Sequence, residues 1–192
     1  WMKTNLPPQT VVVSWWDYGY WITVMGEKIT LADNGTTNST QIAWIGRMFM
    51  STEDDALAMI NEFNAYSSRY DVNYPISYIV VFSTISQAPN GQFLYGDEVK
   101  WRWMAQIAGL NDTALEDTSI TSLLANQWSQ NTQDAALLRW YETFATIAIP
   151  QSDRVLTKLM IFGAFEILEP EHFELSFSSS NNMVFVYRVL YS

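Results

Sequence analysis

The alternation of apolar and polar positions along the chain predicts short buried strands separated by helices. Residues 10–16 and 75–84 are apolar, β-branched runs typical of strands covered on both faces. Residues 27–33 alternate in the manner of a strand with one exposed face. These three runs predict the centre of a sheet in the first half of the chain.

The C-terminal part of the chain is rich in apolar runs of strand length. Residues 158–168 are almost continuously apolar. Residues 172–191 contain two apolar runs on either side of a Ser/Asn turn between Phe177 and Met183. We expect two or three strands in this region.

Helical spacing and helix-start residues mark the remaining segments. Ser39 or Thr40 is expected to cap the first helix, and Ser51 or Thr52 the second, whose first turn carries three acidic residues that suit the helix dipole. Gly109 is expected to end the third helix. The predicted helices span residues 41–50, 51–66, 97–110, 115–128 and 132–148, the last ending before Pro150.

Together these elements predict a mixed α/β (α+β) fold, with helices around a small central β-sheet in one compact domain covering residues 1–192. The chain is 48% hydrophobic and 15% aromatic, which supplies a substantial core. No apolar run approaches the roughly 20 residues of a membrane helix. Because the chain begins Trp1-Met2-Lys3, without an initiator methionine at position 1, we expect it to be part of a longer protein.

Charge and composition exclude several classes of function. Ten Lys and Arg against 20 Asp and Glu give a formal net charge of −10, which argues against nucleic acid as a partner. The absence of Cys excludes disulfides, thiolate metal sites and cysteine nucleophiles. His172 is the only histidine and is expected in a turn, not at a metal. Glu169, Glu171 and Glu174 are interpreted as a charged loop and not as the carboxylate pair of a glycosidase.

Residues 14–21 read SWWDYGYW and surround one carboxylate, that of Asp17, with aromatic side chains. A buried strand favours Val, Ile and Leu, and an unpaired buried Asp costs roughly 2 kcal/mol or more. The pattern therefore indicates a binding site. Taken alone, it also fits a packed aromatic core in which Asp17 caps a turn.

A second motif, DEVKWRWM, begins the helix predicted over 97–110. Asp97, Lys100 and Met104 stand at i, i+3 and i+7, so they fall within about 60° of one another and form a stripe about 10 Å long. An ordinary Asp–Lys helix pair beside a core methionine explains the same spacing.

The two motifs together resemble those of oligosaccharyltransferase catalytic subunits, the membrane enzymes of asparagine-linked protein glycosylation, in particular the short archaeal AglB-like type. WWDYGYWI matches the first signature of that family, and DEVKWRWM fits its DxxKxxxM motif. The segment 29–54 between them is also similar, except that Gln41 stands where many relatives have His. The resemblance covers roughly residues 11–110 and implies that the acceptor-sequon pocket is formed by Trp15, Trp16, Asp17, Tyr18, Gly19, Asp97, Lys100 and Met104.

The acceptor sequon is Asn-X-Ser/Thr, so such a pocket must recognise one small hydroxyl on a flexible peptide. Indole N–H groups of Trp15 and Trp16 only donate hydrogen bonds, whereas ionised Asp17 only accepts, so together they can satisfy both sides of a hydroxyl. A site of this kind rejects an analogue without the hydroxyl by roughly 10⁴ to 10⁵. Contact of Met104 with the Thr methyl would give roughly fourfold preference for Thr over Ser.

The resemblance also implies what this chain lacks. The Mn²⁺ or Mg²⁺ ion, its ligands and the site for the lipid-linked oligosaccharide belong to an N-terminal multi-pass membrane region, so no catalytic or metal-binding residue is expected here. The chain is then the extracytoplasmic C-terminal globular domain of a cell-membrane enzyme, whose partners are the acceptor peptide and the membrane. An outward-facing domain could itself be glycosylated at Asn34, Asn38 or Asn111.

Two other classes of function remain open from the sequence. Exposed Trp and Tyr also serve as stacking platforms in extracellular carbohydrate-binding domains, and an adhesion domain would explain the acidity and the aromatic content.

Overall fold

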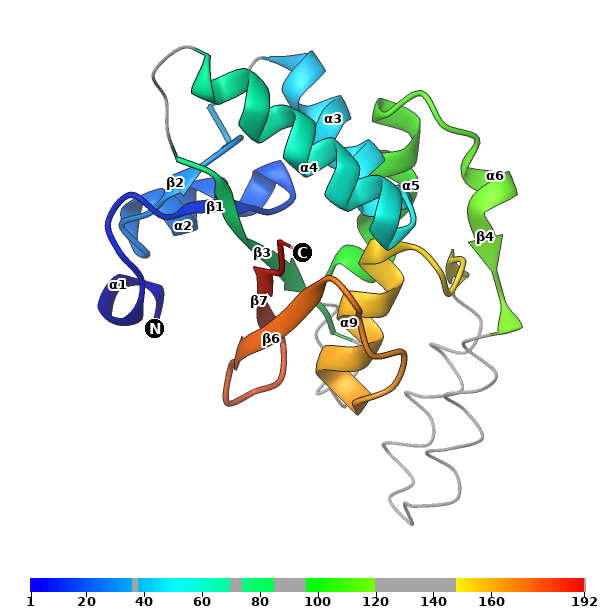
Figure 1. Cartoon of the computed structure of the whole chain (residues 1–192). Helices are drawn as coiled ribbons and strands as arrows, with labels where there is room; N and C mark the ends of the chain where they lie inside the picture. Colours follow the sequence, from blue (N-terminus) through cyan, green and yellow to red (C-terminus); the bar gives the residue numbers. More distant parts are fainter. Residues whose placement is uncertain (36–37, 70–73, 85–95, 120–147, 192) are drawn as a thin grey trace.

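The computed structural model describes residues 1–35, 38–69, 74–84, 96–119 and 148–191. At its centre is a five-stranded mixed sheet of order β2-β1-β3-β7-β6, with helices on both faces (Figure 1). β1 is parallel to β2 and β3, whereas β7 is antiparallel to β3 and β6. The strands are β1 Val11–Val13, β2 Ile29–Thr30, β3 Ile76–Phe82, β6 Phe173–Ser178 and β7 Val184–Val189. The predicted fold class, a mixed α/β domain around a central sheet, is confirmed.

The central strands are buried on both faces, which explains their continuous apolar sequence. Because side chains alternate along a strand, Val11 and Val13 belong to one apolar cluster and Val12 to another. In the same way Ile79 and Val81 of β3 lie in the first cluster, and Val80 lies in the second. The first and larger cluster is the main core of the domain.

The main core lies between the sheet and four helices. These are α3 Ser39–Met50, α4 Glu53–Ser68, α5 Asp97–Ile107 and α9 Val155–Phe165. The smaller cluster, on the other face of the sheet, includes residues of the short helices α1 Met2–Asn5 and α2 Gly19–Val24. Helix α5 lies directly against α3, since a Cβ on Gly46 would be 2.5 Å from the Met104 carbonyl oxygen.

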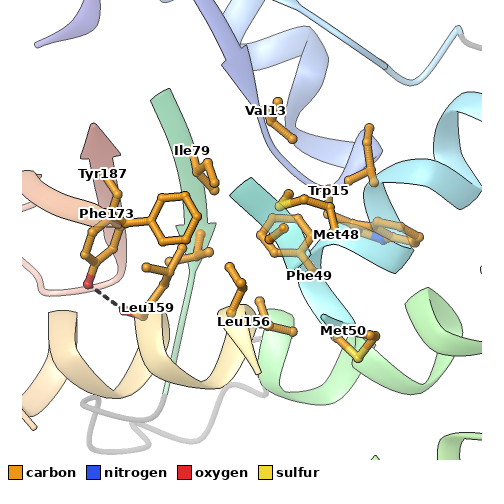
Figure 2. Close-up of a cluster of buried hydrophobic side chains, with 14 of the residues drawn as sticks. Val13, Trp15, Met48, Phe49, Met50, Ile79, Leu156, Leu159, Phe173 and Tyr187 are labelled. Carbon is orange, nitrogen blue, oxygen red and sulfur yellow. Dashed lines mark hydrogen bonds between the residues drawn. The ribbon is translucent and has the colours of Figure 1, made fainter. Parts of the chain in front are cut away.

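Residues 158–165 of the segment predicted as a strand at 158–168 form instead the larger part of helix α9, which ends at Phe165. Helix α9 packs on most of its circumference against the sheet and against other helices. Its sequence therefore lacks the regular spacing of polar residues that would have distinguished a helix from a strand. Figure 2 shows Leu156 and Leu159 of α9 among the core side chains, with the Tyr187 hydroxyl donating to the Leu159 carbonyl oxygen at 2.6 Å. Gly163 permits this close approach, because a Cβ there would be 2.5 Å from the Phe185 ring.

The predicted strands at 172–191 are confirmed as β6 and β7, with the turn between them. The helix predicted over 115–128 does not begin at 115. The short helix α6 Asp112–Leu115 ends there, and β4 Glu116–Asp117 follows. β4 pairs with β5 Ile149–Pro150, so Pro150 lies in a strand. The rest of that predicted helix, and residues 132–147 of the next one, lie outside the described residues.

The helix starts follow capping chemistry. Asn38, and not the predicted Ser39 or Thr40, caps α3 by accepting a hydrogen bond from the Gln41 backbone N–H. Thr52 caps α4 as predicted. In the described part of the chain, no helix is long and apolar enough to cross a membrane.

Candidate functional site

The aromatic motif lies where the chain leaves β1. Val13 is followed by Trp15, then by the 3-10 turn η1 Trp16–Tyr18, and then by α2. Trp15 is 2% exposed and packs in the main core close to Met48 of α3 (Figure 2). Trp16 is partly buried against the same core. The two indoles therefore anchor the turn that presents Asp17 and Tyr18.

Gly19 fixes the position of this turn. A Cβ at Gly19 would be 2.0 Å from the Ala32 carbonyl oxygen and 2.6 Å from the Asp33 Cα. The segment that follows β2 therefore touches the backbone of α2 directly, and only glycine fits between them. The last residue of the WWDYG sequence thus serves the packing of the turn.

Asp17 and Lys100 join the two motifs, as the sequence predicted. The Lys100 Nζ lies 2.5 Å from Asp17 Oδ2, and the two side chains are only 13% and 25% exposed. Because water screens this pair incompletely, its Coulomb attraction is stronger than that of a surface pair. The first turns of α5 and the turn after β1 are therefore held together by charge.

Tyr18 links this ion pair to Asp97. Its hydroxyl accepts a hydrogen bond from Lys100 Nζ at 2.7 Å and donates one to Asp97 Oδ1 at 2.9 Å. The Lys100 Nζ is also 4.4 Å from the centroid of the Tyr18 ring, within cation–π range. Burial and the nearby carboxylates raise the pKa of the Tyr18 hydroxyl, so it stays protonated and remains a donor.

Asp97 is completely buried at the N-terminus of α5. Its Oδ2 accepts a hydrogen bond from the Phe82 backbone N–H at 2.9 Å, which ties α5 to the end of β3. Burial raises the pKa of Asp97 to about 7, although the hydrogen bonds from Phe82 and Tyr18 and the charge of Lys100 oppose that shift. Asp97 thus supports Tyr18 and Lys100 from inside the domain.

The raised pKa of Asp97 predicts how the stability of the domain depends on pH. The ordinary value is 3.8 and the folded value about 7, so between these pH values the folded state holds a proton that the unfolded state has lost. The free energy of unfolding should therefore fall by roughly 2 kcal/mol or more as the pH rises from about 4 to about 7. Urea denaturation across this range measures the change. We expect a smaller change in Asp97→Asn, whereas the exposed control Glu27→Gln should behave like the wild type; equal slopes in all three proteins would contradict the assignment.

Glu98 is a second buried carboxylate, which the sequence did not reveal. It accepts hydrogen bonds from the backbone N–H and from the hydroxyl of Thr84, and its own burial raises its pKa. The sequence predicts a helix start at 96–98, and an acidic residue at a helix start is expected whether or not it is buried. The available signal was Gly96, where a Cβ would be 2.2 Å from Glu98 Oε2.

Met104 is fully buried in the main core together with Trp15. The three residues of the predicted stripe on α5 therefore do not share one exposed face. Asp97 and Met104 face the interior, and Lys100 lies at the edge of the core. In this conformation a peptide methyl group has no access to Met104. Its contact with the Thr methyl stays a prediction.

One oxygen of Asp17 lacks a partner. Oδ2 is held by Lys100, whereas Oδ1 is covered and accepts no hydrogen bond from the described residues. A covered carboxylate oxygen without a donor is costly, so this atom can still accept a hydrogen bond. The same part of the chain holds no group of three or more His, Cys, Asp or Glu that could bind a metal ion, so the residues described here do not fit a metal site.

Comparison with known proteins adds to this geometry. Residues 8–96, which include Trp15 to Gly19, match the model of the STT3/PglB/AglB core domain. This region, slightly less than half of the chain, is similar to that core domain. The matched region ends one residue before Asp97 and does not include α5. The assignment of α5 to the candidate site therefore depends on its contacts with Asp17 and Tyr18.

Proteins from a plant and a yeast are similar to the chain over a region of about the same length. The chain is 37% identical over 109 residues to the STT3B subunit of dolichyl-diphosphooligosaccharide–protein glycosyltransferase from Oryza sativa, and 35% identical over 108 residues to the stt3 subunit from Schizosaccharomyces pombe. These alignments cover 57% and 56% of this chain, but only 13% and 12% of the relatives. The aligned part of the chain thus spans about an eighth of their length.

A solved structure extends the likeness beyond residue 110. The C-terminal globular domain of oligosaccharyltransferase from Archaeoglobus fulgidus superposes with a TM-score of 0.56 and 19% identity, over 98% of this chain and 92% of that one. This likeness shows a shared fold.

Proposed function

We propose that this chain recognises the Ser or Thr of the Asn-X-Ser/Thr acceptor within an oligosaccharyltransferase that moves an oligosaccharide from a lipid carrier to the asparagine amide. The similarity of residues 8–96 to the STT3/PglB/AglB core domain, and of the chain to STT3 subunits, supports the enzyme class. The observation that carries the finer proposal is that Oδ1 of Asp17 has no hydrogen-bond partner among the described residues, beside an Oδ2 that Lys100 holds.

The chemistry of recognition follows from this arrangement. Lys100 holds Oδ2 of Asp17, so that Oδ1 is left to accept the hydrogen of the acceptor hydroxyl. Because Oδ1 has almost no accessible surface, the hydroxyl reaches it only after a neighbouring side chain moves. The indole of Trp16, which is only partly buried, supplies the donor for the hydroxyl oxygen in this proposal.

The remaining parts of the reaction are proposed for the rest of the enzyme. These are the Mn²⁺ or Mg²⁺ ion, the lipid-linked oligosaccharide site and the membrane-spanning segments. A metal ion supplies electrostatic activation when bound, and the described residues contribute no ligand set for it. In this proposal the domain lies on the extracytoplasmic face of an archaeal enzyme of the short AglB type and is itself inactive alone.

Replacing Lys100 with methionine tests the role of the ion pair. We expect kcat/KM for an Asn-X-Thr peptide to fall roughly 10²-fold in the complete enzyme, because Asp17 loses the partner that orients it and a charge-assisted hydrogen bond is worth about 1.5–3 kcal/mol. The control is Lys3→Met, which removes an exposed ion pair with Glu27. Equal activities of the two variants would contradict the role of Lys100.

A further inference from the structure

Helix α5 carries an exposed apolar stripe that neither the core nor the ion pair uses. The side chains of Trp103, Ile107 and Leu110 are exposed, at 65%, 45% and 37%. Trp103 and Ile107 lie on α5, and Leu110 follows its end. A tryptophan that is about two-thirds exposed beside two other apolar side chains is unusual on a water-exposed protein surface and is typical of a surface that binds a partner.

The stripe continues from Lys100. At 100° per residue, Trp103 lies about 60° from Lys100 around the helix, and Ile107 about 20°. The opposite edge of the helix is defined by the buried Trp101 and Ala105, which belong to the main core. Lys100, Trp103 and Ile107 therefore form one edge of α5 that leads away from Asp17.

Polar groups flank the stripe and are already paired. Arg102 bonds Glu116 at 2.9 Å, and Gln106 bonds Asp112 at 3.1 Å. Near the end of α5, the Arg47 Nε of α3 donates to the Ala108 carbonyl oxygen at 3.2 Å. An apolar centre with a satisfied polar rim is the usual anatomy of a binding surface.

We propose that this stripe binds the residues that follow the Ser or Thr of the acceptor polypeptide and selects large apolar side chains there. The proposal rests on the function proposed above. The surface is continuous with Lys100, so a chain whose hydroxyl sits at Asp17 passes it directly. In this proposal the Asn and X residues that precede the hydroxyl lie toward the reacting centre in the rest of the enzyme, and the following residues cross α5.

The dimensions fit a short extended segment. Lys100 and Ile107 are separated by about 10 Å along the helix axis, at roughly 1.5 Å per residue. An extended peptide covers that distance with about three residues. Trp103 then lies within reach of the first or second residue after the hydroxyl, and Ile107 within reach of the third.

The test compares acceptor peptides in the complete oligosaccharyltransferase. Each peptide contains Asn-X-Thr and has either Leu or Ser at one of the three positions after Thr. We expect Leu to raise kcat/KM about tenfold at the best position in the wild type, as partial burial of one apolar side chain provides. In Trp103→Ala this ratio should fall below twofold, whereas Tyr66→Ala, at an exposed aromatic residue of α4, should keep it.

Two results would overturn the proposal. In the first, the Leu preference survives in Trp103→Ala. In the second, Trp103→Ala lowers the rate equally for Leu and Ser peptides, as expected if the stripe docks on another part of the enzyme, a bilayer or a second copy. Asp17→Ala assayed in parallel separates this failure from that of the proposed function. If Asp17→Ala is inactive, the result still supports recognition of the hydroxyl by Asp17, and only the proposal for the stripe fails.

Discussion

Replacement of Asp17 with alanine is expected to lower glycosylation of an Asn-X-Thr acceptor by roughly 10³-fold or more in the complete enzyme. In the proposed function the acceptor hydroxyl loses its hydrogen-bond acceptor, and Lys100 loses the carboxylate with which it is paired. We expect the domain to stay folded, since Trp15, which anchors the turn in the core, is unchanged. Measured rates with saturating donor, together with a thermal melt of the variant, give both quantities.

The matched controls for Asp17 separate charge from packing. Asp17→Ala leaves Lys100, only 13% exposed, without its charged partner and with only Tyr18 to contact, which costs roughly 1–3 kcal/mol of stability. The double variant Asp17→Ala with Lys100→Met should recover part of that stability but none of the activity. Recovery of activity would mean that Asp17 serves only to neutralise Lys100.

Replacement of Gly19 with alanine is expected to have the largest effect on stability. The new Cβ would overlap the Ala32 carbonyl oxygen at 2.0 Å, and both contacting segments are backbone, so neither can move away as a side chain could. Overpacking of this severity costs roughly 3 kcal/mol, or about 6–12 °C in Tm for a domain of this size.

The matched control is Gly35→Ala, in the same region of the fold. A Cβ at Gly35 meets only the Asp33 Oδ1, at 3.3 Å, so the expected change in Tm is small. Activity of Gly19→Ala should fall as well, because the turn carries Asp17 away from Lys100. A Tm within 2 °C or so of the wild type would show that the turn and the segment after β2 are not in rigid contact.

The sequence predicted the contact between Asp17 and Lys100 correctly, but it predicted helix α9 of the C-terminal fold wrongly. Asp17 and Lys100 were expected to meet, and they do, because a strand end and a helix N-terminus each have strong local signals. Helix α9 was predicted as a strand because an apolar segment buried on most sides shows no period from which helix and strand can be distinguished. Packing against the rest of the domain determines whether such a segment forms a helix or a strand.

Burial explains the other differences at the site. Met104 and Asp97 share a helical face with Lys100, and the spacing alone places all three at one pocket. In the structure the face is split by the approach of α3, which covers Met104, and by the end of β3, which covers Asp97. Glu98 was passed over because acidic residues at a helix start are common on surfaces, and its burial depends on Thr84, fourteen residues earlier.

The central claim is that Asp17 accepts a hydrogen bond from the acceptor hydroxyl, and a double-mutant cycle between enzyme and peptide tests it most directly. The cycle compares kcat/KM for Asn-X-Thr and Asn-X-Val peptides in the wild type and in Asp17→Ala. We predict that the wild type prefers Thr by roughly 10³-fold or more, and that the preference falls to a few-fold in the variant because the hydroxyl has lost its acceptor. The same Thr-to-Val ratio in both enzymes would contradict the account and place hydroxyl recognition elsewhere.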